Sequence, residues 1–210
     1  DFAVLSGTRK FILTSSGAVY GKQPSNITHI TEDYKWKSDP SDSSYCIAKR
    51  EAENLCSIYS GLYDIKIKVG RCFAFVGPYL PLNIQYAVGN FILDGIRGAP
   101  ISVKGDGKPY RSYLYAADLT IWLWKILLKG ESNRPYNVGS EYDLSINDLA
   151  NSVANIFTPS PEVIVSNPSN RTSMTERYVP SVERAKRDLG VREWIGLNDS
   201  IKKTVNWYLK

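Results

Sequence analysis

Short apolar runs alternate with helical patterns along the first part of the chain. Residues 10–15, Lys-Phe-Ile-Leu-Thr-Ser, are typical of a strand buried on both faces, and residues 65–75 repeat that pattern. From Tyr45 to Tyr59 the apolar positions fall at helical spacing, and Gly61 is placed to cap that helix. Residues 21–44 are rich in Pro, Ser, Asp and Asn and predict a long loop between the first strand and the helix.

The rest of the chain predicts shorter elements. Helices are expected at 86–96, 119–128, 145–156, 182–189 and 198–209, and strands at 101–103, 112–115, 135–138 and 161–165. The helix at 119–128 is apolar nearly all round, so we expect it to be buried. Ser145 and Asp148 form a capping pair at the start of another helix. Strands that alternate with helices indicate an α/β fold with a largely parallel sheet.

The composition is that of a folded protein which needs no covalent or metal staple. The 210 residues are 43% apolar and 22% charged, and a chain of this length buries roughly 70% of the surface that its unfolded form exposes. The three cysteines form no CxxC pair, which disfavours a zinc cluster, and the single histidine excludes a histidine-rich metal site. Unpaired thiols favour a reducing compartment, and we expect the cytoplasm.

Charge and hydropathy exclude two classes of partner. The net charge is +5, but no run of four or more Lys or Arg occurs, so no nucleic-acid patch is indicated. No apolar stretch approaches the roughly 20 residues of a membrane helix, and the N-terminus lacks the pattern of a signal peptide. The sequence therefore predicts a protein that binds neither nucleic acid nor membrane.

Candidate chemistry lies at the start of the helix that follows the long loop. Tyr45 and Lys49 are four residues apart, which places the phenol and the ammonium on one helix face. A free tyrosine titrates near about 10, and a fixed positive charge beside it favours the phenolate. Tyr45 could then donate and accept a proton at neutral pH. Taken alone, this spacing is more typical of an ordinary amphipathic helix face.

The context of this pair points to a known family. The tripeptide Ser15-Ser16-Gly17 lies at the carboxyl end of a predicted strand, where open α/β sheets bind ligands. A strand, Ser-Ser-Gly-Ala-Val-Tyr-Gly, a long loop and Ser-Tyr-x-x-x-Lys together resemble the extended short-chain dehydrogenase/reductase family, the NAD-dependent epimerase/dehydratase proteins that act on nucleotide-linked sugars. Three further segments, 69–78, 111–118 and 135–139, are similar to that family, as are the terminal helices at 182–190 and 201–208. The resemblance therefore covers essentially the whole chain.

The resemblance implies a role for each matching residue. Ser16 would hydrogen-bond the sugar oxygen, Tyr45 would exchange its proton, and Lys49 would hold the nicotinamide ribose and tune Tyr45. The implied cofactor is NAD or NADP, in contact with Ser15, Tyr45, Lys49, Cys72 and Phe73. The implied substrate is a nucleoside-diphosphate sugar, in contact with Ser16, Asn90, Arg111 and Arg171. Three of these residues have alternatives: Asn90 also suits a helix cap, Arg111 a solvated loop, and Arg177 competes with Arg171 for the diphosphate.

Departures from the family pattern narrow the reaction. Gly17-Ala18 stand where the 4,6-dehydratases of the family carry Asp-Glu, so dehydration is not expected. The cysteine and histidine used for epimerisation at carbons 3 and 5 are absent, because His29 lies in the loop and is expected to face solvent. Cys72 also departs from the usual tyrosine. The resemblance leaves a 4-ketoreductase of a 4-keto-6-deoxy sugar, which we favour slightly, or a 4-epimerase, in deoxysugar or surface-polysaccharide biosynthesis.

One expected motif does not occur. No Gly-x-Gly-x-x-Gly or Gly-x-x-Gly-x-x-Gly fingerprint for the dinucleotide is present. We therefore expect the carboxyl-terminal two-thirds of a family member: a partial Rossmann-like, doubly wound and mostly parallel α/β domain, plus a small α/β substrate-binding lobe. Residues 1–80 would form the first part, and residues 81–210 mainly the second, with 110–130 returning to the first. The chain would form a homodimer, and the alternative function is a catalytically inert nucleotide-sugar-binding fragment.

Overall fold

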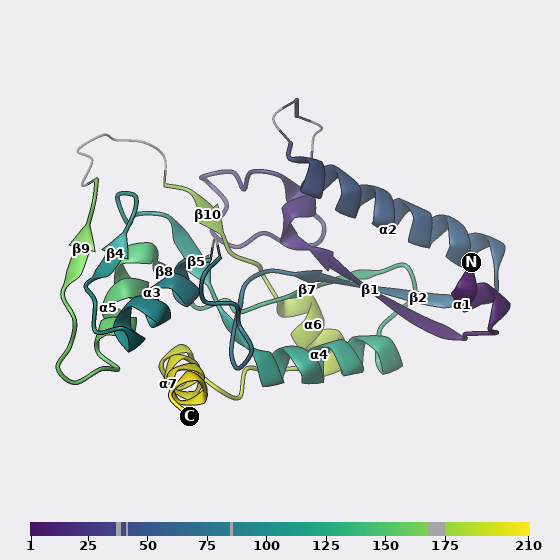
Figure 1. Cartoon of the computed structure of the whole chain (residues 1–210). Helices are drawn as coiled ribbons and strands as arrows, with labels where there is room; N and C mark the ends of the chain where they lie inside the picture. The colour runs from purple at the N-terminus through teal and green to yellow at the C-terminus, as the bar shows by residue number, and fades with distance from the viewer. Residues whose placement is uncertain (37–38, 41, 85, 168–174) are drawn as a thin grey trace.

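The computed structural model describes residues 1–36, 39–40, 42–84, 86–167 and 175–210. Figure 1 shows an elongated molecule with two parts side by side. In one part a parallel sheet lies between long helices, and in the other short strands surround a pair of shorter helices. The N-terminus lies at the far end of the first part, and the C-terminal helix lies against the second.

The first part is organised by a three-stranded parallel sheet. Its order is β1-β2-β7, where β1 is Lys10–Ser16, β2 is Lys66–Cys72 and β7 is Pro135–Val138. The register places Ser16 opposite Cys72, so both strands end at the same edge. The prediction of an α/β fold with a parallel sheet is confirmed.

Helices cover both faces of this sheet. α2 (Ser44–Leu62) lies on one side, and α4 (Ala116–Lys129) lies on the other (Figure 1). α6 (Glu183–Leu189) packs against α4 and β7. The core between them is fully buried around Trp122, Ile126 and Val138. A short helix, α1 (Phe2–Leu5), precedes the sheet, and the 3-10 helix η1 (Gly17–Tyr20) follows β1.

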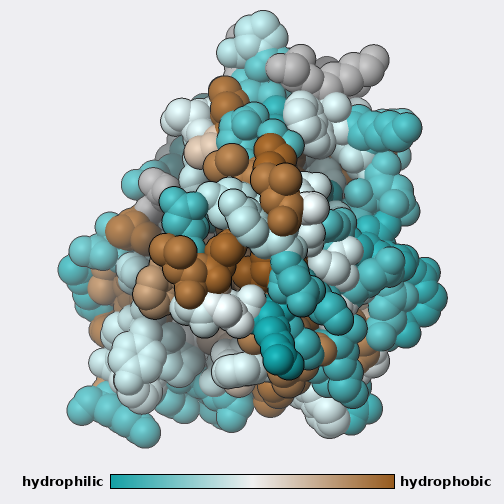
Figure 2. Space-filling model, turned by 90° about the vertical axis from the view of Figure 1, so that its right-hand side faces the viewer, coloured by the Kyte–Doolittle hydropathy of each residue, from teal (hydrophilic) through white to brown (hydrophobic). Residues whose placement is uncertain are grey.

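Two sequence expectations about these helices are wrong, and the apolar face of α2 is more exposed than that of a core helix. Helix α4 is not buried all round, because Trp124 and Leu128 are more than half exposed. The apolar stripe of α2 is only partly a core face, since Ile47 is 50% and Leu55 is 55% exposed. Gly61 lies inside α2 rather than beyond its end. The periodicity of a sequence detects an apolar helix face but does not show what covers that face. Figure 2 shows apolar side chains gathered on the end of the molecule that carries α1.

The second part is built from short elements. Its helices are α3 (Ala87–Ile96), α5 (Ile146–Ala154) and α7 (Leu197–Tyr208). Strand β4 (Ile101–Val103) pairs in parallel with β9 (Val163–Val165), and β5 (Tyr110–Ser112) lies between β8 (Asp143–Ser145) and β10 (Arg177–Tyr178). Strand β3 (Phe75–Val76) pairs with β6 (Leu114–Tyr115). The core of this part is one cluster that includes Phe91, Ile92, Ile101, Leu149 and Val153.

Local signals in the sequence set the ends of two helices. The Ser145 hydroxyl accepts the Asp148 N–H at 3.0 Å, which satisfies one of the free donors at the start of α5. Gly190 ends α6 with a φ of 59°, a left-handed conformation that glycine adopts without strain. The Ser145 cap agrees with the capping pair predicted from the sequence.

Candidate active site

The candidate site begins where β1 ends. Ser16 is the last residue of the strand and is 6% exposed. Its hydroxyl oxygen accepts the Ala18 N–H at 3.1 Å and so caps η1. This bond and the strand ladder hold Ser16 at the carboxyl edge of the sheet, which is where ligands bind in open α/β folds.

Helix α2 brings Tyr45 and Lys49 to this edge. Ser43 caps the helix by accepting the Cys46 N–H at 3.2 Å. The Lys49 ammonium donates to the Thr14 carbonyl of β1 at 2.9 Å and lies 5.7 Å from the centre of the Tyr45 ring. Tyr45 is 55% exposed, so its phenol is accessible to a ligand. The structure therefore brings the three residues that the family resemblance marks as catalytic to the end of one strand.

Cys72 and Phe73 line the neighbouring strand end. Burial raises the pKa of the Cys72 thiol to about 11, although the charge of Lys49 opposes that shift. Cys72 is therefore a neutral, apolar neighbour of Lys49 at physiological pH. The Phe73 ring packs on Tyr178 with ring centres 4.7 Å apart. Both predicted cofactor residues thus lie at the same sheet edge as Ser16.

Ser15 is engaged in a buried polar network behind this edge. Its hydroxyl donates to Glu53 of α2 at 2.5 Å, and Glu53 also accepts two bonds from the Arg71 guanidinium, at 3.0 and 2.7 Å. Arg71 donates further to the Tyr20 phenol at 2.9 Å, and Tyr20 donates to Asn137 of β7 at 2.7 Å. Burial raises the pKa of Tyr20 to about 12, so this phenol stays protonated.

The network ties α2 to the sheet in one register. Glu53 follows Lys49 by four positions, as Lys49 follows Tyr45, so all three lie on one helix face. The bidentate pair with Arg71 therefore fixes the same face that presents Tyr45 and Lys49. Because the Ser15 hydroxyl is already bonded to Glu53, its side chain serves the scaffold in this structure, whereas the sequence suggested a cofactor contact.

A residue that the sequence did not indicate joins the site from the second part of the molecule. The Tyr178 ring of β10 packs on Phe73, and its phenol oxygen lies only 2.8 Å from the position that a Cβ of Gly17, the residue after Ser16, would take. A two-residue strand far from any motif gives no signal for such a contact. Only the pairing of β10 with β5 carries this ring across to the end of β1.

The three arginines considered for the diphosphate have different positions. Arg111 lies on β5 opposite Tyr178, donates to the Tyr110 carbonyl at 2.8 Å and is 3.4 Å from the Glu176 carboxylate. Arg177, the competitor of Arg171, forms an ion pair with Asp143 and stacks 4.3 Å from the Tyr110 ring centre. Its guanidinium is therefore already bound by side chains of the protein itself, Asp143 and Tyr110. Arg171 lies outside the described residues.

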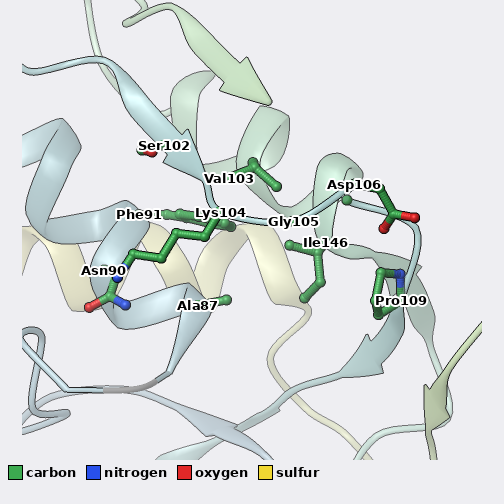
Figure 3. Close-up of a pocket in the computed structure, with 11 residues that line it drawn as sticks. Ala87, Asn90, Phe91, Ser102, Val103, Lys104, Gly105, Asp106, Pro109 and Ile146 are labelled. Atoms are coloured by element: carbon green, nitrogen blue, oxygen red, sulfur yellow. The ribbon is translucent and has the colours of Figure 1, made fainter. Parts of the chain in front are cut away.

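Asn90 is not part of the group around Ser16. It lies within α3 rather than at its cap, which is Tyr86, and it lines a separate cleft of about 390 Å³ in the second part. Figure 3 shows the Lys104 side chain extending toward Asn90 across Phe91. The cleft is lined by Ala87, Asn90, Phe91, Ser102, Val103, Lys104, Gly105, Asp106, Gly107, Pro109 and Ile146. An apolar floor with a few polar groups is the usual lining of a small-molecule site.

The described residues form neither a metal-binding cluster nor a membrane-spanning helix. Among the described residues, no group of three or more His, Cys, Asp or Glu side chains is arranged to hold a metal ion. None of the helices in the described part of the chain combines the length and the apolar composition that a membrane crossing requires. His29, expected to face solvent, is only partly exposed, and its Nε2 lies 2.9 Å from the Glu141 carbonyl oxygen.

Solved structures of similar fold include an epimerase with a bound sugar nucleotide and a protein with bound NADPH. The UDP-glucose 4-epimerase of Thermotoga maritima with UDP-glucose matches 99% of this chain and 65% of its own, with a TM-score of 0.87 and 24% identity. RMD of Pseudomonas aeruginosa, complexed with NADPH, matches 97% of this chain and 68% of its own, with a TM-score of 0.82 and 22% identity. At these identities the likeness establishes the fold.

Curated relatives match nearly the whole of this chain. The trifunctional UDP-glucose 4,6-dehydratase/UDP-4-keto-6-deoxy-D-glucose 3,5-epimerase/UDP-4-keto-L-rhamnose-reductase of Arabidopsis thaliana is 29% identical over 95% of this chain and 29% of its own length. UDP-glucuronic acid decarboxylase 1 of Xenopus tropicalis is 27% identical over 96% of this chain and 47% of its own. The chain spans less than half the length of either relative.

A sequence profile that matches more than half of this chain identifies its family. The profile of the NAD dependent epimerase/dehydratase family covers residues 1–139. That range includes β1 with Ser16, the helix with Tyr45 and Lys49, and β2 with Cys72. The chain belongs to the NAD dependent epimerase/dehydratase family.

Proposed function

We propose that this protein acts at carbon 4 of a nucleoside-diphosphate hexose, as a 4-ketoreductase of a 4-keto-6-deoxy sugar or as a 4-epimerase, with NAD or NADP. One observation carries the proposal. Lys49 reaches the end of β1 and donates to Thr14, and this contact places Tyr45 beside the strand that ends in Ser16. An acid-base phenol, a cation and a hydroxyl donor at one sheet edge suit the movement of a proton at a sugar hydroxyl.

Each of the three residues has a distinct task in this proposal. Tyr45 takes the proton of the sugar 4-hydroxyl, or returns one to a 4-keto oxygen. The Lys49 ammonium stabilises the phenolate form of Tyr45 by its charge. Ser16 hydrogen-bonds the same sugar oxygen and holds it within reach of Tyr45. The exposed position of Tyr45 is consistent with this role, because its oxygen must meet the substrate directly.

The residues present fit the nicotinamide end of the cofactor, which the family uses. Lys49 spends one of its three donors on Thr14, so two N–H groups remain for a ribose hydroxyl. Phe73 and the neutral Cys72 supply an apolar wall beside it. When bound, the cofactor accepts or returns the hydride of the sugar carbon. The sequence holds no glycine fingerprint for the pyrophosphate, so these residues account for one end of the cofactor only.

The second part of the molecule would bind the nucleotide. The cleft lined by Asn90 is concave and largely apolar, which suits a flat base, and the Asn90 amide offers both a donor and an acceptor. Arg111, partly exposed on β5, would bind the diphosphate between that cleft and Ser16, with Arg171 as its proposed partner. In this division of labour residues 1–80 carry the acid-base chemistry, and residues 81–210 mainly bind substrate, with 110–130 contributing to the first part.

Two further properties are part of the proposal. The exposed apolar residues of α1 and α2 would be covered in a homodimer; among them are Phe2, Leu5, Leu55, Ile58 and Leu62. The apolar end in Figure 2 supports this assignment for α1. A role in deoxysugar or surface-polysaccharide biosynthesis, in the cytoplasm, would suit a sugar nucleotide as substrate.

An inert nucleotide-sugar-binding fragment is the second candidate. The observation that favours it is that the sequence contains no glycine fingerprint for the cofactor pyrophosphate. In that case the nucleotide cleft would function without turnover.

Turnover by the full-length protein separates these functions. The protein is supplied with UDP-glucose and NAD, and separately with UDP-4-keto-6-deoxyglucose and NADPH. Consumption of NADPH indicates the reductase, and UDP-galactose formed without net cofactor consumption indicates the epimerase. The inert fragment is tested on the 210-residue chain itself, where stabilisation by UDP without turnover of either sugar supports it. In an active protein, Tyr45→Phe should lower kcat at least about 100-fold. Tyr59→Phe on the same helix is the matched control, because its phenol contacts Asp1 and not the site.

A further inference from the structure

Arg50 is a buried arginine in a helix whose other residues are mostly exposed. It is 9% exposed, and together with Cys46 it makes up the buried residues of α2. Taking a guanidinium out of water is costly unless its charge and its N–H donors find partners. The groups that bind Arg50 therefore explain why a charged side chain lies in this position.

The Arg50 guanidinium joins three segments of the chain. Its Nε donates to the Val19 carbonyl of η1 at 2.8 Å, and its Nη1 donates to the Asp42 carboxylate, whose side chain is 7% exposed. Trp36, earlier in the same loop as Asp42, stacks on the guanidinium with its ring centre 3.7 Å from the Arg50 Cζ. Figure 1 shows η1, the purple turn after β1, against the start of α2. One planar group thus holds η1 and two points of the long loop against α2.

Both ends of this link are close in sequence to the proposed catalytic residues. Val19 follows Ser16 by three positions, and the Ser16 hydroxyl caps η1. Asp42 precedes Tyr45 by three positions, and Ser43 between them caps α2. The N–H groups in the first turn of a helix have no partner within the helix, so this turn opens readily. Because Tyr45 lies in that turn, its position depends on how the segment ahead of it is held.

Gly21 allows the link to be this tight. Its φ of 68° is a left-handed conformation that glycine adopts without strain. A Cβ at Gly21 would lie 3.1 Å from an Asp42 carboxylate oxygen and 3.4 Å from the Arg50 Nη2. Nη2 has no hydrogen-bond partner among the described residues. The two other guanidinium nitrogens and the Trp36 ring therefore set the position of the Arg50 side chain.

We propose that Arg50 is a positioning residue for the reaction at carbon 4, and that it fixes Tyr45 in the first turn of α2 relative to Ser16 at the end of β1. The inference rests on the proposed function, because Arg50 acts only through those two residues. Lys49 and Glu53 tie α2 to strands of the sheet, whereas Arg50 ties it to the segment that follows Ser16. The long loop between β1 and α2 is thereby part of the catalytic arrangement.

Substitution by lysine in the full-length protein tests this inference, using whichever of the two sugar nucleotides is turned over. Arg50→Lys keeps the charge but loses the planar fork that spans Val19 and Asp42. We expect kcat to fall at least about tenfold, because small misplacements of reacting groups are costly, while KM stays within about threefold. Asp42→Asn should also lower kcat, and the double variant should fall no further than Arg50→Lys, because the pair acts as one unit. An unchanged kcat, or losses that multiply, would overturn the proposal.

Arg184 is the matched control for a purely structural role. Like Arg50, it donates to a backbone carbonyl, that of Pro135 at 3.0 Å, and pairs with a carboxylate of the long loop, Asp33. Its side chain is 11% exposed, and it bonds to the first residue of β7 rather than to a segment beside Ser16. Arg184→Lys should lower the urea midpoint of unfolding about as much as Arg50→Lys and leave kcat unchanged. An equal fall of kcat in both variants would show that Arg50 contributes stability alone.

Amide hydrogen exchange on the 210-residue chain tests the link without turnover. Three N–H groups are bonded to a capping serine: Cys46 to Ser43 at 3.2 Å, Ala18 to Ser16 at 3.1 Å, and Asp148 to Ser145 at 3.0 Å. Arg50→Lys should speed exchange at Cys46 and Ala18 at least about threefold and leave Asp148 unchanged, because only α2 and η1 meet Arg50. Unchanged exchange at Cys46 and Ala18 would contradict the proposal. If instead Tyr45→Phe is fully active, the proposed function fails, and the exchange rates still decide whether Arg50 holds the two segments.

Discussion

Lys49 on α2 donates to the Thr14 carbonyl of β1 at 2.9 Å, two residues before Ser16 at the end of that strand. A strand carbonyl is a fixed acceptor, so this bond sets the distance of the ammonium from the sheet edge. The cation is thereby held near both the Tyr45 ring and the Cys72 thiol. One side chain thus couples the orientation of α2 to the electrostatics of the strand ends.

Replacement of this cation should affect chemistry more than stability. Lys49→Met keeps the length of the side chain but removes the charge and the bond to Thr14. We expect kcat of the full-length protein to fall at least about 100-fold, because the Tyr45 phenolate loses its stabilising charge. The free energy of unfolding in urea should change by about 1 kcal/mol, the typical value for one partly exposed hydrogen bond. Lys202→Met, an exposed lysine of α7, is the control and should change neither quantity.

The ion pair of Glu53 and Arg71 should dominate the stability of the site. Both side chains are largely buried, at 16% and 10% exposure. Glu53→Gln leaves the Arg71 charge without its partner, so we expect a loss of about 3 kcal/mol in urea unfolding. Replacing both residues, Glu53→Leu with Arg71→Met, should cost less than the single change, because no buried charge is then left unpaired.

The exposed pair of Glu131 and Arg134 is the control for this prediction. Its side chains are 63% and 37% exposed, and their closest N–O distance is 2.6 Å. Glu131→Gln should therefore change the unfolding free energy by less than about 1 kcal/mol. Equal losses from Glu53→Gln and Glu131→Gln would show that the Glu53 pair does not act as a buried anchor.

The thiol of Cys72 should react slowly until the pH is strongly alkaline. Burial raises its pKa from 9.0 to about 11, so less thiolate is present at any given pH below that value. A variant with Cys72 as its only cysteine should be alkylated by iodoacetamide about 100-fold more slowly at pH 8 when folded than in urea, since two pH units separate the two pKa values. The rate should rise about tenfold per pH unit and level off above about pH 11.

Lys49 gives this measurement an internal check. Its charge lowers the pKa of Cys72, so Lys49→Met should raise that pKa and slow alkylation further at pH 9. Lys202→Met should have no effect. An unchanged rate in the Lys49→Met variant would place the ammonium away from the thiol and contradict the arrangement at the sheet edge.

Asn90 should matter for nucleotide affinity and not for chemistry. If UDP binds in the cleft of about 390 Å³, Asn90→Ala removes one hydrogen-bonding side chain from its wall. We expect the Kd for UDP, measured by calorimetry on the 210-residue chain, to rise about tenfold, which corresponds to about 1.4 kcal/mol. Asn151→Ala on α5, where the amide donates only to the Asn147 carbonyl, should leave the Kd unchanged. The same Kd in both variants would exclude the cleft as the UDP site.

Local chemistry in the sequence was sufficient to predict several elements. The strand that ends in Ser16, the helix that carries Tyr45 and Lys49, and the cap made by Ser145 all form at the predicted places. Each depends on interactions within a few residues, such as a capping hydroxyl or the period of an apolar face, and these are visible in a single sequence. The alternation of strands and helices likewise predicted the parallel sheet. The prediction that the strand ending in Ser16 is buried on both faces is wrong, because Lys10, Phe11 and Thr14 are exposed.

Contacts between distant segments were decided only by the tertiary structure. The Ser15 hydroxyl donates to Glu53, Arg177 is paired with Asp143, and Trp124 stays 58% exposed on a helix whose composition predicted burial. Tyr178 is the clearest case, because no residue next to it in the sequence predicts that its side chain lies near Ser16. The physical reason is that periodicity records which face of an element is apolar, whereas strand pairing and packing determine which groups that face meets.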